Sequence, residues 1–200
     1  MIRHGATKSN RERRYLGKTE EVLSEQGIEE LIRYKELRCY PEVDCLFASP
    51  MKRCLQTAEI LYPRVKPVCI AEWREIDFGV FEGKNHVELR GDRRYREWID
   101  SGGKLPFPEG ESREEFILRC GEGFRKMTER IEAMEREPET IGMIIHGGTI
   151  MALLSRYCGG EYFDYQVPNG GGYVCTVGGI SVEDGPCSLV LSHPVMLVTR

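Results

Sequence analysis

The sequence predicts an α/β protein, a three-layer α/β/α sandwich with a mostly parallel sheet and a small helical cap. Two observations support this class. Short apolar runs alternate with amphipathic helical segments along the chain, a pattern typical of a parallel sheet covered by helices. A polar segment rich in Arg and Gly, at about residues 82–111, interrupts the alternation and predicts the cap.

Length and composition fit one globular unit. The chain has 200 residues, of which 40% are hydrophobic and 30% charged, enough apolar content for a sizeable core and too little bias for disorder. We therefore expect a single domain over residues 1–200, with the cap as an insertion. The net charge of −4 and the pI of about 5.7 argue against a nucleic-acid partner, although they leave room for a local positive pocket.

Cysteine usage and hydropathy indicate the compartment. The eight cysteines show no Cys-x-x-Cys spacing, and several sit in apolar runs, so we expect reduced core thiols in a cytoplasmic protein rather than disulfides or a metal site. No stretch approaches the ~18 apolar residues that a membrane span needs, and no secretory signal precedes the domain. We expect neither membrane contact nor export.

The predicted strands are short apolar runs. Met1-Ile2 has the character of the last piece of a strand that ends at Arg3. The other runs are continuous or alternating, as buried strands are. They cover Val43–Ala48, Val65–Ile70, Ile141–Ile145, Val174–Val177 and Ser188–Leu191, the last continuing in altered form to Val198.

The predicted helices carry recognisable start signals. Ser24 is the expected N-cap of a helix over Leu23–Leu37, and Ser49 with Pro50 is expected to cap a helix that reaches about Tyr62. Ser112–Glu115 has the spacing of a capping box. It would open a long helix to about Arg136, and a further helix is expected over Thr149–Tyr157.

The triplet Arg3-His4-Gly5 is the first candidate for chemistry. It follows the end of an apolar strand, and ligands bind outside the carboxyl ends of strands in open α/β sheets. A neutral imidazole is a competent nucleophile toward phosphorus, and arginine is the preferred planar partner for phosphate oxygens. The triplet therefore favours a phosphoryl site in which His4 reacts and Arg3 binds.

Two further segments repeat this arrangement. His146 lies between the apolar run Ile141–Ile145 and the turn Gly147-Gly148, where a helix N-terminus offers free N–H groups to an anion. A tight strand-to-helix turn with a merely hydrogen-bonded histidine would give the same pattern. Arg53 lies one turn inside a helix that starts at a strand end, although an arginine there is ordinarily exposed to solvent.

Four blocks together resemble the histidine phosphatase superfamily, the phosphoglycerate-mutase-like enzymes. The first resembles the family's signature, the second its second-arginine helix, the third its acid/base segment and the fourth its second-histidine turn. They occur in the family's order and span nearly the whole chain. The blocks are Arg3–Asn10, Ser49–Ala58, Trp73–Gly83 and His146–Gly148.

The resemblance implies a role for each matching residue. His4 would be the nucleophile and form a phosphohistidine, and Glu75 would protonate the leaving alkoxide and then activate water. A structural role is expected for Glu82. The implied mechanism needs neither a metal nor a cofactor, because side chains supply the positive charge. The implied ligands of the phosphoryl oxygens are Arg3, Arg53, His146, Asn10 and the backbone N–H of Gly147.

The chain departs from the family pattern at two places. Only Met1 and Ile2 precede Arg3, whereas the family's first strand has several residues there, and a shortened central strand would weaken the site that holds His4. Ala6 stands where many members have glutamate, although alanine also occurs there.

The expected function is phosphomonoester hydrolysis, with a small phosphomonoester as the partner. The segments Arg14–Glu20 and Glu161–Asn169 look most like α-ribazole-5′-phosphate phosphatase, which acts late in assembly of the cobalamin nucleotide loop. Asn169, with the glycines after it, is expected to place a loop near the phosphate. Lys18 is expected either to meet the leaving group or to be an ordinary solvated loop residue.

Several alternatives stay open. Broad phosphomonoesterase activity is compatible with this layout. A cofactor-dependent phosphoglycerate mutase is disfavoured because such enzymes carry a larger insertion, and a non-catalytic phosphate-binding module is disfavoured because the motif residues are intact. His86 and His193 have no motif around them and are expected in surface or loop positions. A homodimer is neither indicated nor excluded.

Overall fold

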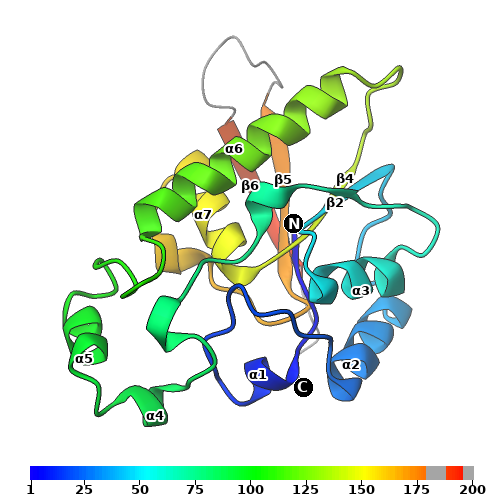
Figure 1. The fold of residues 1–200 in the computed structure, drawn as a ribbon. Helices are drawn as coiled ribbons and strands as arrows, with labels where there is room; N and C mark the ends of the chain where they lie inside the picture. The colour runs from blue at the N-terminus through cyan, green and yellow to red at the C-terminus, as the bar shows by residue number, and fades with distance from the viewer. Residues whose placement is uncertain (179–187, 196–200) are drawn as a thin grey trace.

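The computed structural model describes residues 1–178 and 188–195, which form one six-stranded sheet in the order β3-β2-β4-β1-β5-β6 (Figure 1). The strands β3, β2, β4 and β1 pair in parallel, whereas β5 and β6 are antiparallel. The predicted mostly parallel sheet is therefore confirmed. The strands are β1 Ile2–Arg3, β2 Cys45–Ala48, β3 Val68–Cys69, β4 Ile141–Ile145, β5 Gly172–Gly178 and β6 Ser188–Val195.

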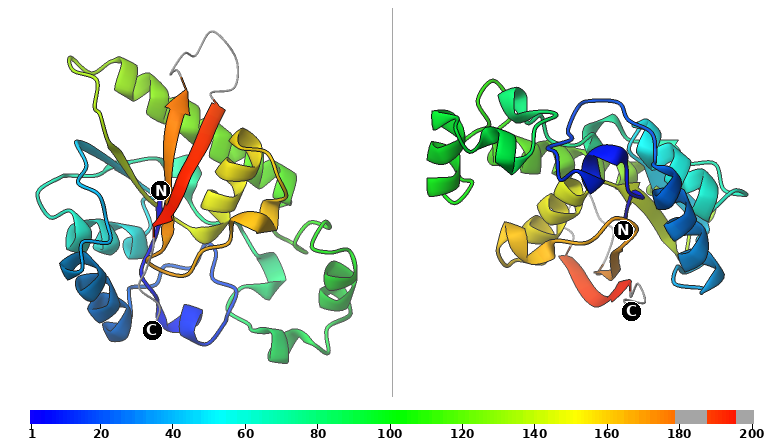
Figure 2. Two further views of the ribbon diagram at one scale, coloured as in Figure 1. Left: turned by 180° about the vertical axis from the view of Figure 1, so that it is seen from behind. Right: turned by 90° about the horizontal axis from the view of Figure 1, so that it is seen from below.

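Helices cover both faces of the sheet, which confirms the three-layer architecture. The helices α2 (Glu25–Glu36) and α3 (Lys52–Leu61) lie on one face, and α6 (Arg113–Glu132) and α7 (Gly147–Tyr157) lie on the other (Figure 2). Side chains of β4 alternate between these layers, because successive residues of a strand point to opposite faces. Ile144 packs in the core under α2 and α3, whereas Met143 and Ile145 pack in the core under α6 and α7.

Three parallel strands end together at one edge of the sheet. Arg3 of β1 is in register with Ile145 of β4, and Ala48 of β2 is in register with Ile144. The residues that follow these strands therefore meet at the carboxyl edge, where open α/β sheets bind ligands.

The segment predicted as the helical cap, at about residues 82–111, lies beyond this edge of the sheet. It contains α4 (His86–Leu89) and α5 (Arg93–Asp100), which extend away from the sheet (Figure 1). A cluster of aromatic rings packs this segment against the rest of the protein. Ring pairs within about 7 Å attract one another, so the cluster holds the two parts together. The rings of this cluster belong to Tyr15, Phe78, Phe81, Tyr95, Trp98 and Phe107.

Most predicted boundaries hold within a few residues. Ser24 caps α2 by accepting a hydrogen bond from Gly27 N, and Ser112 forms the predicted capping box with Glu115. The helix α6 ends at Glu132, before the predicted Arg136, and α7 starts at Gly147 rather than Thr149. The strand predicted over residues 65–70 shortens to β3, and β6 runs to Val195, so that the predicted continuation to Val198 lies outside the described residues.

The start predicted for α3 is wrong. The helix begins at Lys52 with Met51 in the N-cap position, and no side chain caps it. The hydroxyl of Ser49 is 2.8 Å from His146 Nε2, at the neighbouring strand end, and accepts a longer hydrogen bond from Met51 N at 3.4 Å. A serine before proline has the sequence pattern of a helix N-cap. The sequence does not indicate that Ser49 will contact His146, because the two residues are far apart in the chain.

The remaining expectations concern the positions of the cysteines, of His86 and His193, and membrane contact. Cys54 and Cys120 are buried thiols, as expected, whereas Cys69 is exposed at the end of β3. His86 is exposed, as expected. His193, expected in a surface or loop position, lies in the strand β6. Across the described ranges, no helix has the length and apolar character to cross a membrane.

The packing of α2 predicts that substitutions at two adjacent residues, Leu31 and Ile32, change the free energy of unfolding by very different amounts. Leu31 is 1% exposed and Ile32 is 44% exposed. We expect Leu31→Ala to lower the free energy of unfolding by about 2–5 kcal/mol, because it leaves a cavity. Ile32→Ala should change it by no more than about 0.5 kcal/mol. Urea unfolding of both variants measures the difference, and equal losses would contradict the packing described.

Candidate active site

The site begins with two buried histidines side by side. His4 follows β1 and His146 follows β4, and the pairing of these strands continues through a hydrogen bond from His4 N to Ile145 O at 3.0 Å. The two imidazole centroids are 5.2 Å apart and the rings are steeply inclined to one another, edge to face. Both side chains are almost fully buried. His4 and His146 are far apart in the chain, but they lie side by side because they follow two neighbouring strands.

The hydrogen bond of His4 fixes its tautomer. His4 Nδ1 is 2.7 Å from the carbonyl oxygen of Gly5, which can only accept. Nδ1 therefore carries the proton and donates, and in the neutral ring the lone pair lies on Nε2. This is the tautomer that a nucleophilic histidine needs.

The surroundings keep His4 neutral. Burial lowers its pKa well below the ordinary value of 6.5, and the positive charges of Arg53 and Arg3 lower it further. The pKa of His146 is also lowered well below its ordinary value, first by burial and then by Arg53. Both rings thus stay unprotonated at neutral pH, because burial and a neighbouring cation both disfavour the imidazolium form.

Arg53 and Ser49 orient His146. Arg53 Nε donates to His146 Nδ1 at 3.3 Å, so the ring proton lies on Nε2, which donates to Ser49 Oγ at 2.8 Å. Ser49 is therefore a site residue that the sequence reasoning assigned to helix capping. No signal in the sequence alone distinguishes the two roles.

Arg53 is completely buried and also anchors a loop. Its Nη1 donates to Thr19 O at 3.0 Å and its Nη2 to Gly17 O at 2.8 Å. The carboxylate of Glu82 accepts hydrogen bonds from the N–H groups of the same two residues, at 2.9 and 3.0 Å. Glu82 therefore holds this loop from the opposite side, in line with the structural role expected for it.

Arg3 retains a buried donor without a partner. Its Nη1 donates to Val167 O at 2.7 Å, whereas its Nε has no hydrogen-bond partner among the described residues. A buried unsatisfied donor costs about 1–3 kcal/mol, so an acceptor reaching Arg3 would be favoured. Gly147 lets the helix backbone approach, since a Cβ there would lie 3.2 Å from Arg3 Nε.

Glu75 brings a carboxyl group to the same place. Its oxygens accept hydrogen bonds from Ile76 N at 3.0 Å and from Gly148 N, at the start of α7, at 3.4 Å. Burial raises the pKa of Glu75, while the Ile76 hydrogen bond and the charges of Arg53 and Arg3 oppose that rise. A raised pKa favours the protonated form that a general acid needs. A Cβ at Gly148 would lie 2.3 Å from Glu75 Oε1, so a larger residue there would displace this carboxyl group.

Asn10 and Asn169 close one side of the site. Asn169 Nδ2 donates to His4 O and to Asn10 Oδ1, both at 3.1 Å. Gly170 N donates to Arg3 O at 3.0 Å. The loop predicted near the phosphate therefore packs on the backbone of the first motif. Asn10 is linked to the backbone of His4 through Asn169, and its contact with a phosphoryl group stays a prediction.

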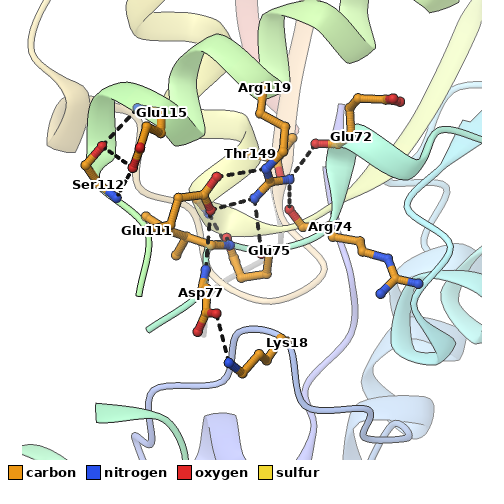
Figure 3. Close-up of polar contacts among 12 residues, drawn as sticks. Lys18, Glu72, Arg74, Glu75, Asp77, Glu111, Ser112, Glu115, Arg119 and Thr149 are labelled. Atoms are coloured by element: carbon orange, nitrogen blue, oxygen red, sulfur yellow. Dashed lines mark hydrogen bonds and ion pairs between the residues drawn. The ribbon is translucent and has the colours of Figure 1, made fainter. Parts of the chain in front are cut away.

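Lys18 is directed elsewhere. It is largely exposed and forms an ion pair with Asp77, with Nζ 2.8 Å from Oδ2 (Figure 3). It is not among the residues that line the cavity described next. Its predicted contact with a leaving group therefore needs the Asp77 ion pair to open, and it stays a prediction.

A cavity of about 440 Å³ lies against Arg3, Glu75 and the Gly147-Gly148 turn, whereas the buried His4, His146 and Arg53 are not among its lining residues. Its polar lining includes Arg3, Glu75 and the backbone of Gly147-Gly148, and its opposite walls are apolar. Such a combination of apolar walls with a few converging polar groups is typical of small-molecule sites. The aromatic wall residues are Tyr15, Phe78, Trp98, Phe107, Tyr162 and Phe163.

Arg113 connects the two sides of this cavity. Its guanidinium lies over the rings of Tyr162 and Phe163 and donates to Gly103 O near the end of α5. Cation–π contacts of this kind add about 0.5–2 kcal/mol each. In the part of the chain described, no group of three or more His, Cys, Asp or Glu side chains has an arrangement that could hold a metal ion.

Comparison with known proteins identifies the family. Residues 1–191 match the family described as the histidine phosphatase superfamily, branch 1. The chain therefore belongs to this superfamily, as the four sequence blocks predicted. A Bacillus subtilis protein named "Uncharacterized phosphatase PhoE" is 28% identical over 163 residues, which cover 80% of this chain and 77% of that protein.

Solved structures share the fold. The α-ribazole phosphatase from Shigella flexneri superposes with a TM-score of 0.78 at 22% identity, covering 96% of this chain and 94% of that one. A phosphoglycerate mutase from Thermus thermophilus superposes with a TM-score of 0.67 at 30% identity, covering 98% of this chain and 96% of that one. Phosphatases and mutases are thus both found among the chain's neighbours.

The buried histidines give a prediction that requires no substrate. We expect the imidazole NMR signals of His4 and His146 to keep their neutral form when pH falls from about 7.5 to about 5.5, across the usual histidine pKa. The reason is that burial and two arginines oppose protonation. His4→Asn assigns the signals. A titration of His4 near pH 6.5 would contradict the electrostatic account.

Proposed function

We propose that this protein hydrolyses phosphomonoesters without a metal, through a phosphohistidine formed on His4. The observation that carries the proposal is the state of His4, whose Nδ1 is committed to Gly5 O and whose lowered pKa keeps Nε2 unprotonated. The positive charges of Arg53 and Arg3 act on this ring and also on the carboxyl group of Glu75, which together are the set of groups that phosphoryl transfer requires.

The first step transfers the phosphoryl group to the enzyme. His4 Nε2 attacks phosphorus, and the bond between phosphorus and the leaving oxygen breaks as the N–P bond forms. Protonated Glu75 gives its proton to the leaving oxygen and becomes a carboxylate. The unpartnered Arg3 Nε is available to a phosphoryl oxygen. Arg53 and His146 are neighbours of His4 and would have to give up contacts with Thr19, Gly17 or Ser49 to bind that group directly.

The second step returns the enzyme to its starting state. Water attacks phosphorus, the N–P bond breaks and its electron pair returns to His4 Nε2. The Glu75 carboxylate takes the proton from the attacking water, so phosphate is released and Glu75 is again protonated. The raised pKa of Glu75 suits both duties, because it brings the carboxyl group toward the working pH.

The cavity walls favour an alcohol with a flat apolar body as the leaving group. Aromatic side chains surround the space above Arg3 and Glu75, and ring stacking adds about 0.5–1.5 kcal/mol per pair beyond apolar burial. Besides Arg3, the cationic side chain in the lining is Arg113, which is already engaged with Gly103 O. This supports hydrolysis over a bisphosphate-dependent mutase reaction, which would need further cationic groups.

For the particular substrate we propose α-ribazole-5′-phosphate, whose benzimidazole base would stack on the aromatic walls. The fold of the Shigella flexneri α-ribazole phosphatase and the resemblance of Arg14–Glu20 and Glu161–Asn169 support this choice. A broad specificity for aromatic phosphomonoesters is the second candidate, because the same walls accept other flat leaving groups.

Phosphate release from a substrate panel in EDTA tests the proposal. The panel contains α-ribazole-5′-phosphate, 3-phosphoglycerate and an aryl phosphate. We expect activity to persist in EDTA and to be lost by about a thousandfold or more in His4→Ala, because the nucleophile is removed. His86→Ala is the matched control, since this exposed histidine lies on α4.

The outcomes separate the candidates. A strong preference for α-ribazole-5′-phosphate supports the specific assignment, and similar rates on the aryl phosphate support broad specificity. Loss of all activity in EDTA would contradict the metal-free mechanism. Phosphate binding without turnover in the folded wild-type protein would indicate the non-catalytic module instead.

A further inference from the structure

Arg119 of α6 holds the backbone of the segment that carries Glu75 (Figure 3). Its Nη1 donates to Glu72 O at 2.7 Å and to Arg74 O at 2.9 Å, and its Nη2 reaches Glu75 O at 3.5 Å. One guanidinium therefore contacts three carbonyl groups within four residues. The side chain is about 29% exposed, so these bonds are partly shielded from water.

Glu111 fixes this guanidinium and also holds the other side of the segment. Arg119 Nε donates to Glu111 Oε1 at 2.8 Å and Nη2 to Oε2 at 2.7 Å, a bidentate pair (Figure 3). Glu111 N donates to Asp77 O at 3.0 Å, and Asp77 N donates back to Glu111 Oε2 at 3.4 Å. The backbone is thus tied on both sides of Glu75 by one pair of residues.

No regular secondary structure holds the backbone of this segment, although Ile76 packs in the core and Asp77 pairs with Lys18. The short helix η1 (Ala71–Trp73) ends before it and η2 (Gly79–Phe81) starts after it, so residues 74–78 belong to no helix or strand. The carboxyl group of Glu75 has two backbone N–H partners among the described residues, Ile76 and Gly148. Its place therefore depends on where the backbone is held, and a displacement of about 1 Å in a reacting group costs up to about 100-fold in rate.

We propose that Arg119, held by Glu111, is a positioning residue for proton transfer by Glu75. The inference rests on the proposed phosphatase function and adds a group that does not touch the substrate. Its task requires a planar side chain with several donors, because one cation serves three carbonyl groups and both oxygens of a carboxylate. Lysine, with a single ammonium group, cannot make this set of contacts.

The test compares leaving groups in matched variants. Arg119→Lys and Glu111→Gln remove the bidentate contact while keeping side chains of similar size. Arg125→Lys is the matched control, since Arg125 is on the same helix and pairs with Glu122 and Glu129, whose side chains are each 43% exposed. Glu75→Gln provides the reference for loss of the general acid. For each variant, kcat and KM are measured on an alkyl phosphate and on an aryl phosphate.

We expect a loss in kcat that depends on the leaving group. Arg119→Lys and Glu111→Gln should lower kcat on the alkyl phosphate about 10–100-fold, and on the aryl phosphate less than about threefold, because a poor leaving group needs the proton from Glu75. KM should change little. Glu75→Gln should show the same pattern with a larger loss, about 10²–10⁴-fold on the alkyl phosphate, and Arg125→Lys should match wild type.

The results distinguish this inference from the proposed function. If wild type is active and Glu75→Gln shows the leaving-group pattern but Arg119→Lys and Glu111→Gln do not, the positioning role is overturned and the phosphatase assignment stands. Equal losses on both substrates also overturn it, because they indicate a general structural effect. If wild type releases no phosphate, the proposed function itself fails. Should Arg119→Lys not fold in thermal melting, Glu111→Gln decides.

Discussion

The parallel pairing of β1 with β4 is the constraint on which the rest of the structure depends. It places His4 and His146 at the same edge of the sheet with their rings 5.2 Å apart. β1 has only two residues, and its neighbours hold it through Arg3 N to Gly171 O and His4 N to Ile145 O. Backbone hydrogen bonds from both sides therefore position His4, the proposed nucleophile.

Burial then shifts the pKa of both groups to which we assign the chemistry, His4 and Glu75. It lowers the pKa of His4 and raises the pKa of Glu75, because both lose the water that would stabilise their charged forms. Arg3 and Arg53 reinforce the shift of His4 and oppose that of Glu75. One cationic, desolvated pocket thus keeps the imidazole neutral and leaves the carboxyl group able to hold a proton, which is the pair of states that phosphoryl transfer to histidine uses.

The sequence predicts well what local pattern determines. Apolar runs located β2 and β4, and Ser24 and Ser112 located two helix starts, because caps and strands depend on near neighbours. Of the five residues that the sequence assigned to catalysis, His4 and Arg53 contact His146, and Arg3 and Glu75 line the neighbouring cavity. What it misses depends on long-range contacts. Ser49 has the pattern of a cap but bonds to His146, and Lys18 pairs with Asp77, 59 residues away. The contacts of Arg119 with carbonyl groups carry no sequence signal at all.

The central claim is that His4 Nε2 forms a bond to phosphorus, and trapping that intermediate tests it most directly. The enzyme is mixed with a radiolabelled aryl phosphate, quenched in alkali, where phosphohistidine survives, and digested for peptide mapping. The account predicts label on the peptide that contains His4 in wild type, and no label in His4→Ala. Turnover with no labelled protein, or with label on another residue, would contradict it.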